Sequence, residues 1–157
     1  MQKLLQNKKI AILAAGGVNE RHMTEIQKGL MKAGAFMRVI SVDTALINSW
    51  NGSGWGVNFT VDVNLNTALG VDYDMLIIPG GARSIERFSR TAHTKRFISS
   101  LARLHRPIGV IEDGAELLKI AEVDKNAENI IHIDENEMAV LVTHFAENSS
   151  EQLLEAA

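Results

Sequence analysis

One short stretch limits what this chain can fold into: an apolar run at residues 108–111 continues directly into Glu112-Asp113-Gly114 and then into a helical pattern. Because no residues remain for a loop, a strand must turn sharply into a helix and present Glu112 above the edge of a sheet. This is the layout of a nucleophile elbow, in which small residues surround a nucleophile. Here the residue at the elbow is a carboxylate.

The amino-acid composition excludes several kinds of functional site. The 157 residues include no cysteine, which excludes disulfides, thiol catalysis and thiolate metal sites. Hydrophobic residues make up 46% and charged residues 22%, which is typical of a soluble globular protein, and we expect a single domain over residues 1–157. The net charge is −3 and the basic residues are scattered, so we expect no nucleic-acid partner.

The chain shows no sign of a membrane or secretory segment. No apolar run approaches the length of about 18 residues that spans a bilayer, and the N-terminus lacks the apolar core of a signal peptide. We therefore expect a cytoplasmic protein with no membrane partner.

The first part of the chain alternates between strand and helix patterns. Residues 10–14 form an apolar run that is too short for a helix and predicts a buried strand. Asn19 is a suitable N-cap for a helix that ends at Gly34, and residues 36–42 predict a second strand. A strand–helix–strand unit of this kind implies parallel strands joined by a right-handed crossover.

Residues 43–68 are less regular. Trp50 and Trp55 lie among three glycines, and residues 59–63 alternate as in an edge strand, which predicts a small β excursion from the main sheet. The two tryptophans either line a pocket or become buried against a partner subunit, and we favour the interface.

The next segment contains the clearest strand. Residues 74–78, apolar from Met75 onward, predict a strand buried on both faces, and Pro79-Gly80-Gly81 ends it. A short helical turn is expected from Ser84, followed by a longer helix capped by Thr91. The side chains expected to point inward from this longer helix are Phe97, Ile98, Leu101 and Leu104.

Two short apolar runs close the pattern, at residues 129–133 and 138–142, and predict a hairpin-like or final strand pair. Ser149 resembles the start of a capping box for a short last helix. The whole alternation predicts a doubly wound, flavodoxin-like α/β sandwich of three layers with a mostly parallel sheet. A site is then expected beyond the carboxyl ends of the strands, where residues 16–20, 79–83 and 112–114 converge.

Two segments together resemble a known family. Residues 72–81, with the apolar-Asp-x-apolar-Pro-Gly-Gly pattern, and residues 107–118, with the elbow, are similar to the DJ-1/PfpI family of the class I glutamine amidotransferase-like superfamily. The resemblance extends over residues 8–118 and implies the same three-layer fold.

The resemblance also implies which functional groups are missing. The catalytic cysteine of the family falls on Glu112, the histidine that often follows it on Asp113, and the partner glutamate on Asn19, with Glu20 beside it. The glycine pair that helps to form an oxyanion site is kept as Gly80-Gly81. The chain therefore looks like the cysteine-less, DJ-1-like C-terminal domain of large-subunit catalases, although no haem-catalase portion is present.

The candidate site has two interpretations. Adjacent carboxylates near a helix N-terminus raise the pKa of one of them, so Glu112 and Asp113 would act as general acid and base. Alternatively, Glu112 fills the former cysteine pocket and bonds Asn19 or nearby amides, which we favour. Gly80 and Gly81 likewise form either an anion-binding nest or a purely structural turn.

Three further residues are weaker candidates. Arg83 follows the glycine pair and either holds an anionic ligand or is a solvated surface residue. His144 follows the last predicted strand, and His22 lies near the start of the first helix; either would be a base at neutral pH or a structural residue. The five histidines lack metal-ligand spacing, so we expect neither a metal nor a cofactor.

These observations favour a catalytically silent domain, a pseudoenzyme that acts as a binding or assembly module. We expect a homodimer or higher homo-oligomer, with a protein partner or a small anionic or polar metabolite near Asn19, Gly80-Gly81 and Glu112 as further candidates. The alternative is a cysteine-independent hydrolase or hydratase that uses Glu112 and Asp113 on a small carbonyl compound. Glyoxalase, deglycase, protease and peroxide-sensing activities, which the resemblance ties to the cysteine, are not expected.

Overall fold

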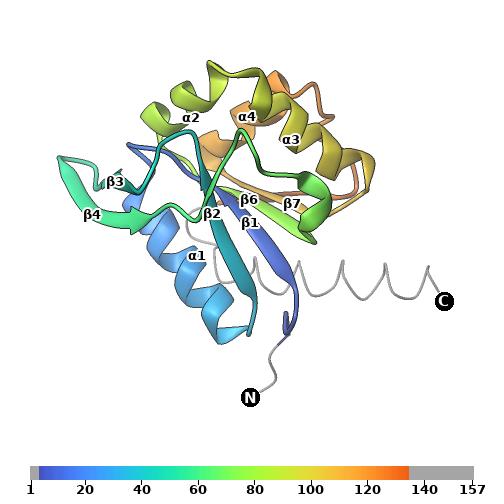
Figure 1. Cartoon of the computed structure of the whole chain (residues 1–157), viewed down its shortest axis with the longest axis horizontal. Helices are drawn as coiled ribbons and strands as arrows, with labels where there is room; N and C mark the ends of the chain where they lie inside the picture. Colours follow the sequence, from blue (N-terminus) through green and yellow to red (C-terminus); the bar gives the residue numbers. More distant parts are fainter. Residues whose placement is uncertain (1–3, 135–157) are drawn as a thin grey trace.

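The computed structural model describes residues 4–134 and has a six-stranded parallel sheet at its centre (Figure 1). The strand order is β5-β2-β1-β6-β7-β8, and every neighbouring pair is parallel. The first half of the chain therefore adds β2 and β5 on one side of β1, and the second half adds β6, β7 and β8 on the other side. The strands are β1 (Lys9–Leu13), β2 (Phe36–Ser41), β5 (Val63–Asn64), β6 (Met75–Ile78), β7 (Ile108–Ile111) and β8 (Ile130–Ile133).

Helices cover both faces of this sheet, which confirms the predicted three-layer α/β sandwich. Helix α1 lies on one face, and α2, α3 and α4 lie on the other (Figure 1). The helices are α1 (Glu20–Lys32), α2 (Ala82–Ser89), α3 (Ala92–Arg103) and α4 (Glu116–Ile120), with short 3₁₀ segments η1 (Gly70–Asp72) and η2 (Glu112–Ala115).

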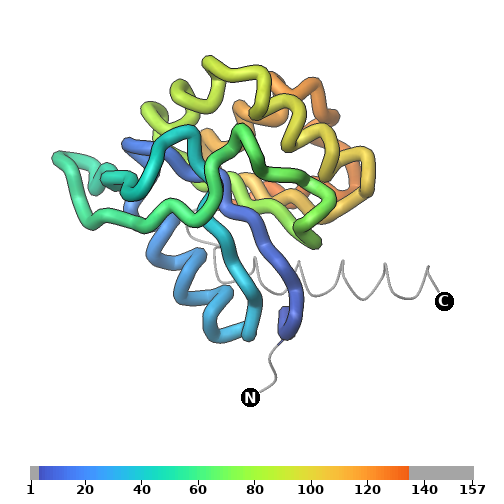
Figure 2. Tube along the Cα trace, viewed as in Figure 1, coloured from blue at the N-terminus to red at the C-terminus, as the bar shows by residue number. Residues whose placement is uncertain are grey.

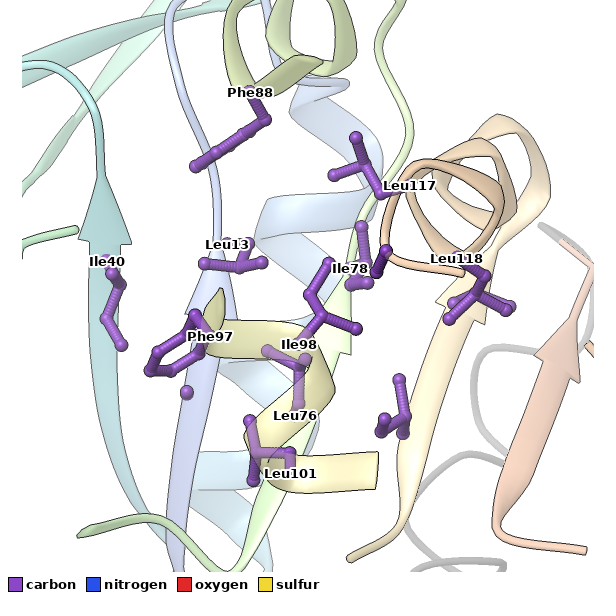
Figure 3. Packing of buried hydrophobic residues seen from close by; sticks show 14 of the residues in the cluster. Leu13, Ile40, Leu76, Ile78, Phe88, Phe97, Ile98, Leu101, Leu117 and Leu118 are labelled. Carbon is purple, nitrogen blue, oxygen red and sulfur yellow. The ribbon is translucent and has the colours of Figure 1, made fainter. Parts of the chain in front are cut away.

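The alternation of side chains along each strand divides the interior into two cores. Ile10 and Ile12 of β1 pack in the cluster that contains Met23, Ile26 and Leu30 of α1. Their neighbours in β1 point to the opposite face and join the cluster beneath α2, α3 and α4 (Figure 3). A strand buried on both faces needs apolar residues at every position, which explains the continuous apolar runs of the sequence.

The predicted helix caps are confirmed. The Asn19 side chain accepts a hydrogen bond from the His22 amide at 3.1 Å, and the Thr91 side chain accepts one from the His93 amide at 3.2 Å. Gly34 follows the end of α1 with φ of 78°, a conformation that glycine adopts without strain.

Two helix details differ from the prediction. Helix α2 begins at Ala82, before Ser84, and runs for eight residues rather than a single turn. Leu104 is 44% exposed, so its predicted inward position is wrong. It is the C-cap of α3, where the backbone leaves the helix and carries the side chain away from the apolar stripe.

The predicted β excursion is a hairpin formed by β3 (Leu46–Trp50) and β4 (Trp55–Thr60), which pair antiparallel. Figure 2 shows this hairpin projecting beyond the main sheet. The strand predicted over residues 59–63 is divided: β4 ends at Thr60, and β5 begins at Val63 and pairs with β2 at the sheet edge.

At the other edge, β8 lies parallel to β7. The run at 138–142, His144 and the helix expected after Ser149 lie outside the described residues. Over residues 4–134, no helix is both long enough and apolar enough to cross a membrane.

Candidate functional site

The sharp turn predicted after β7 is present. Glu112 has φ of 49°, in the left-handed region, and opens the 3₁₀ turn η2 that continues into α4. Gly114 is required two residues later, because a Cβ at this position would overlap the carbonyl oxygen of Ile78 in β6. Strand β7 therefore enters the helix layer without a loop, and the elbow packs against the neighbouring strand.

The glycine turn after β6 lies beside this elbow, and the protein itself uses both of its amides. The Gly80 N–H donates to Nδ1 of His22 at 2.9 Å. The Gly81 N–H donates to the carboxylate of Asp113, at 3.2 Å from Oδ1 and 3.3 Å from Oδ2. The two amides that the resemblance assigns to an oxyanion site are thus occupied by side chains of α1 and η2.

Neighbouring groups pack closely against both glycines on the side where a Cβ would lie. A Cβ built on Gly80 would overlap Oδ1 of Asp113 and would lie 2.9 Å from Cε1 of His22. A Cβ built on Gly81 would lie 2.8 Å from the Asn19 nitrogen. Both glycine positions therefore need a residue without a side chain, although Gly81 itself stays partly exposed.

The two carboxylates of the elbow lie in different surroundings. Asp113 turns back toward Gly81, whereas Glu112 is exposed and lines a shallow hollow of about 330 Å³ with Val110, His132 and Asp134. The carboxylate that accepts the Gly81 amide belongs to Asp113. That Glu112 fills the former cysteine pocket stays a prediction.

Asn19 and Glu20 bridge neighbouring segments. The Asn19 backbone amide donates to the Gly80 carbonyl at 2.9 Å, and its side-chain oxygen caps α1. The Glu20 carboxylate accepts the backbone N–H of Val57 in β4 at 3.3 Å. Both residues thus join the start of α1 to the segments beside it.

His22 is completely buried, and the sequence analysis gave it little weight. Because the Gly80 amide is a donor, Nδ1 must accept, and a neutral ring therefore carries its proton on Nε2. A signal was available in the sequence: His22 shares the buried face of α1 with Met23, Ile26 and Leu30, where a polar side chain needs a specific partner.

Arg83 lies on the other side of the glycine pair, in the first turn of α2. Its guanidinium carbon is 4.6 Å from the centre of the Trp50 ring and 4.9 Å from that of Trp55. The two indoles are 5.4 Å apart and almost perpendicular, at 88°. The tryptophans expected at a subunit interface are thus packed on each other and on Arg83, and Trp55 remains 55% exposed.

This cluster borders a cavity of about 690 Å³ between α1, the hairpin turn and the start of α2. Its walls include Asn19, Thr24, Glu25, Trp50, Asn51 and Arg83. Among residues 4–134, no group of three or more histidine and carboxylate side chains is arranged to hold a metal ion.

Comparison with known proteins identifies relatives over most of the chain. The model of the DJ-1/PfpI family matches residues 8–138. The catalase HPII of Mycobacterium avium is 25% identical over 142 residues, which are 90% of this chain and 20% of the catalase. The chain therefore spans a small part of that relative.

Solved structures share the fold at low identity. A two-domain protein of Anabaena variabilis, with DJ-1/ThiJ/PfpI-like and ferritin-like domains, gives a TM-score of 0.80 at 18% identity, over 92% of this chain and 48% of that one. Oxidized DJ-1 of Toxoplasma gondii gives a TM-score of 0.71 at 19% sequence identity, over 94% of this chain and 98% of that one. A mutant DJ-1 of Schizosaccharomyces pombe gives a TM-score of 0.74 at 15% sequence identity, over 89% of this chain and 90% of that one.

Proposed function

The chain belongs to the DJ-1/PfpI family, and from this premise we propose that it is a catalytically silent member, a binding or assembly module in place of an enzyme. It has no cysteine, so the elbow presents Glu112 where the family resemblance places a thiol. What remains of the site is a backbone frame without the nucleophile.

One observation carries this proposal: the amides of Gly80 and Gly81 already donate to His22 and Asp113. Acyl or carbonyl chemistry at an elbow needs free donors aimed at the position of the developing oxyanion. Here a substrate oxygen would have to displace two internal acceptors, one of them a carboxylate held on the same turn. The site is thus closed to the chemistry for which such an elbow is suited.

The rival function, hydrolysis or hydration of a small carbonyl compound, is less well supported. It requires Glu112 and Asp113 to act on one bound molecule as base and acid. Asp113 accepts from the Gly81 amide, whereas Glu112 lines a separate hollow with His132 and Asp134. The Asp113 carboxylate is thus engaged by the backbone of the neighbouring turn, which suits a structural role better than catalysis on a bound substrate.

Two observations support an assembly role. The similar catalase and the Anabaena variabilis protein are both much longer than the stretch that matches this chain, so related domains occur as parts of larger proteins. The hairpin also exposes apolar side chains, at 54% for Leu46, 55% for Trp55 and 53% for Val57. Exposed apolar groups gathered on one element are typical of a contact surface, and a second copy of the chain is the partner we propose.

The test combines an activity assay with a mass measurement. The purified chain is incubated with methylglyoxal, and we expect no turnover above that of the Glu112→Gln variant. Analytical ultracentrifugation is expected to give a dimer or higher oligomer that Val57→Glu dissociates. Turnover that disappears in Glu112→Gln would support the rival enzyme, and a monomer at all concentrations would overturn self-assembly through the hairpin.

A further inference from the structure

The cavity between α1, the hairpin turn and α2 adjoins the glycine turn, because Asn19 and Gly81 line it, but it lies apart from the elbow residues. Glu112 and Asp113 do not line it, and its volume of about 690 Å³ lies within the range of about 300–1,000 Å³ that is usual for small-molecule sites. The cavity is therefore large enough for a small organic ligand, and nothing that we propose for the elbow assigns it a role.

Arg83 lies at the wall of this cavity beside two aromatic rings. Both tryptophan rings contact its guanidinium group and restrict where that group can move. Over residues 4–134, no carboxylate or carbonyl accepts a hydrogen bond from its N–H groups. Arg87 and Arg96 differ from it: Arg87 pairs with Asp43, and Arg96 donates to the carbonyls of Leu65 and Ala68 at 2.8 Å each.

An arginine that is packed against aromatic rings and keeps its N–H groups unused is prepared to bind a planar anion. A guanidinium edge matches a carboxylate in a bidentate arrangement and loses little side-chain freedom when it is already oriented. The Trp50 ring, which also lines the cavity, provides an apolar surface beside that edge.

The remaining charges limit the ligand. The α1 wall contributes Arg21 but also the carboxylates of Glu20 and Glu25. With Arg83, the side chains that line the cavity therefore carry two positive and two negative charges. This balance disfavours ligands with several negative charges, such as nucleotides and polyphosphates, and leaves a ligand with one negative charge as the best match.

We propose that this cavity binds a small organic monocarboxylate, whose carboxylate accepts hydrogen bonds from the edge of Arg83 while its apolar body lies against Trp50. The site goes beyond the silent-module function, because it uses neither the elbow nor the amides of Gly80 and Gly81. A closed elbow and an open ligand cavity then exist side by side on one domain.

The protein provides its own reporter for this binding. Trp50 and Trp55 are the two tryptophans of the chain, and both contact Arg83. The purified chain is titrated with benzoate while indole fluorescence is followed, and benzamide serves as the uncharged probe of the same shape. We expect a saturable change with a Kd of about 1 mM or tighter for benzoate and at least roughly tenfold weaker binding of benzamide.

Variants separate the arginine from general charge. Arg83→Gln is expected to weaken benzoate binding by roughly tenfold or more, and Arg83→Lys by less, because it keeps the charge and loses the planar edge. Arg90→Gln is the matched control: Arg90 follows α2 and pairs with Glu86 on the surface, outside the cavity, so its removal should leave the Kd unchanged.

Isothermal titration calorimetry repeats these measurements, because replacing Arg83 also changes the fluorescence of the free protein. Circular dichroism confirms that each variant is folded. Absence of saturable benzoate binding, equal affinity for benzamide, or an unchanged Kd in folded Arg83→Gln would each overturn the proposal. These results do not depend on methylglyoxal turnover or on oligomer mass, so they leave the proposed function to its own test.

Discussion

The carboxylate of Asp113 accepts the backbone N–H of Gly81, at 3.2 Å from Oδ1 and 3.3 Å from Oδ2. The two residues are 32 positions apart, and their contact joins the turn after β7 to the residue that precedes α2. An internal side chain thus occupies the place where an external anion would bind.

Removing the Asp113 carboxylate should destabilise the fold and open an anion site. Asp113→Ala leaves a partly buried amide without its acceptor, which costs about 1–3 kcal/mol of unfolding free energy. Urea denaturation measures the loss, and formate in the buffer should recover part of it by binding at the Gly81 amide. Asp113→Asn keeps an acceptor oxygen and is expected to lose less; equal stability of all three proteins would contradict this role.

The left-handed backbone at Glu112 gives a prediction that does not depend on what its side chain contacts. Glu112→Gly and Glu112→Ala both remove the side chain, but only alanine is strained at φ of 49°. The glycine variant should therefore be more stable than the alanine variant by about 1 kcal/mol.

Glu116 is the matched control, because its φ of −62° is ordinary for a helix. There the order should reverse, with alanine more stable than glycine by about 1 kcal/mol. Thermal or urea unfolding of the four variants measures both differences. The same order at both positions would mean that strain at the elbow is negligible.

His22 should matter for stability although it is a single polar residue in an apolar helix face. His22→Leu keeps much of the volume but leaves the Gly80 N–H without its acceptor, with an expected loss of about 1–3 kcal/mol. His93→Leu, at an exposed position near the start of α3, should change stability by less than about 0.5 kcal/mol. Chemical denaturation compares the two, and equal small effects would show that the Gly80 contact adds nothing.

Ionisation of Tyr73 should lower the stability of the fold at high pH. Burial raises the pKa of its phenol above the ordinary value of 10.0, opposed by the nearby Arg38 and reinforced by Asp72 and Asp62. Because the raised pKa belongs to the folded state, the contribution to stability is complete below pH 10.0 and is lost as pH rises through the folded pKa.

The Tyr73→Phe variant isolates this effect. It keeps a ring to pack edge-on against Phe97, now 5.9 Å away, but has no proton to lose. The unfolding free energies of both proteins are compared from neutral pH to above pH 10.0, where the parent should lose stability faster than the variant. Parallel curves would contradict the assignment to Tyr73.

Restoring the cysteine alone should not restore chemistry. Glu112→Cys places a thiol at the elbow, but His22 and Asp113 still occupy the amides of Gly80 and Gly81. We expect this variant to turn over no methylglyoxal, and Glu112→Cys with Asp113→Ala to be the better candidate for gained activity. Turnover by the single variant would show that the occupied amides do not close the site.

Local signals explain why most of the fold could be predicted from the sequence. The caps at Asn19 and Thr91 each act within three residues, and the apolar strands need only to be buried on two faces. The elbow could be predicted as well, because no residues remain for a loop before Gly114 and the strand must turn directly into the helix. Leu104 was misplaced because helical spacing continues by one residue past the point where the backbone ends the helix.

The site was harder to predict, because its contacts join distant segments through side-chain directions. Glu112 and Asp113 are adjacent in sequence, and only the backbone angle at the elbow determines which of them meets Gly81. Arg83 likewise meets two tryptophans that the hairpin brings beside α2. Neither relationship leaves a periodic pattern in the sequence.

The left-handed residue at the end of β7 also bears on what an elbow says about activity. In this chain the left-handed turn is present without any thiol, and the close approach of Gly114 to Ile78 is a packing contact that such a turn satisfies. The backbone of an elbow therefore does not by itself indicate a reactive group. Competence for catalysis has to be judged from the side chain at the elbow and from the occupants of the neighbouring amides.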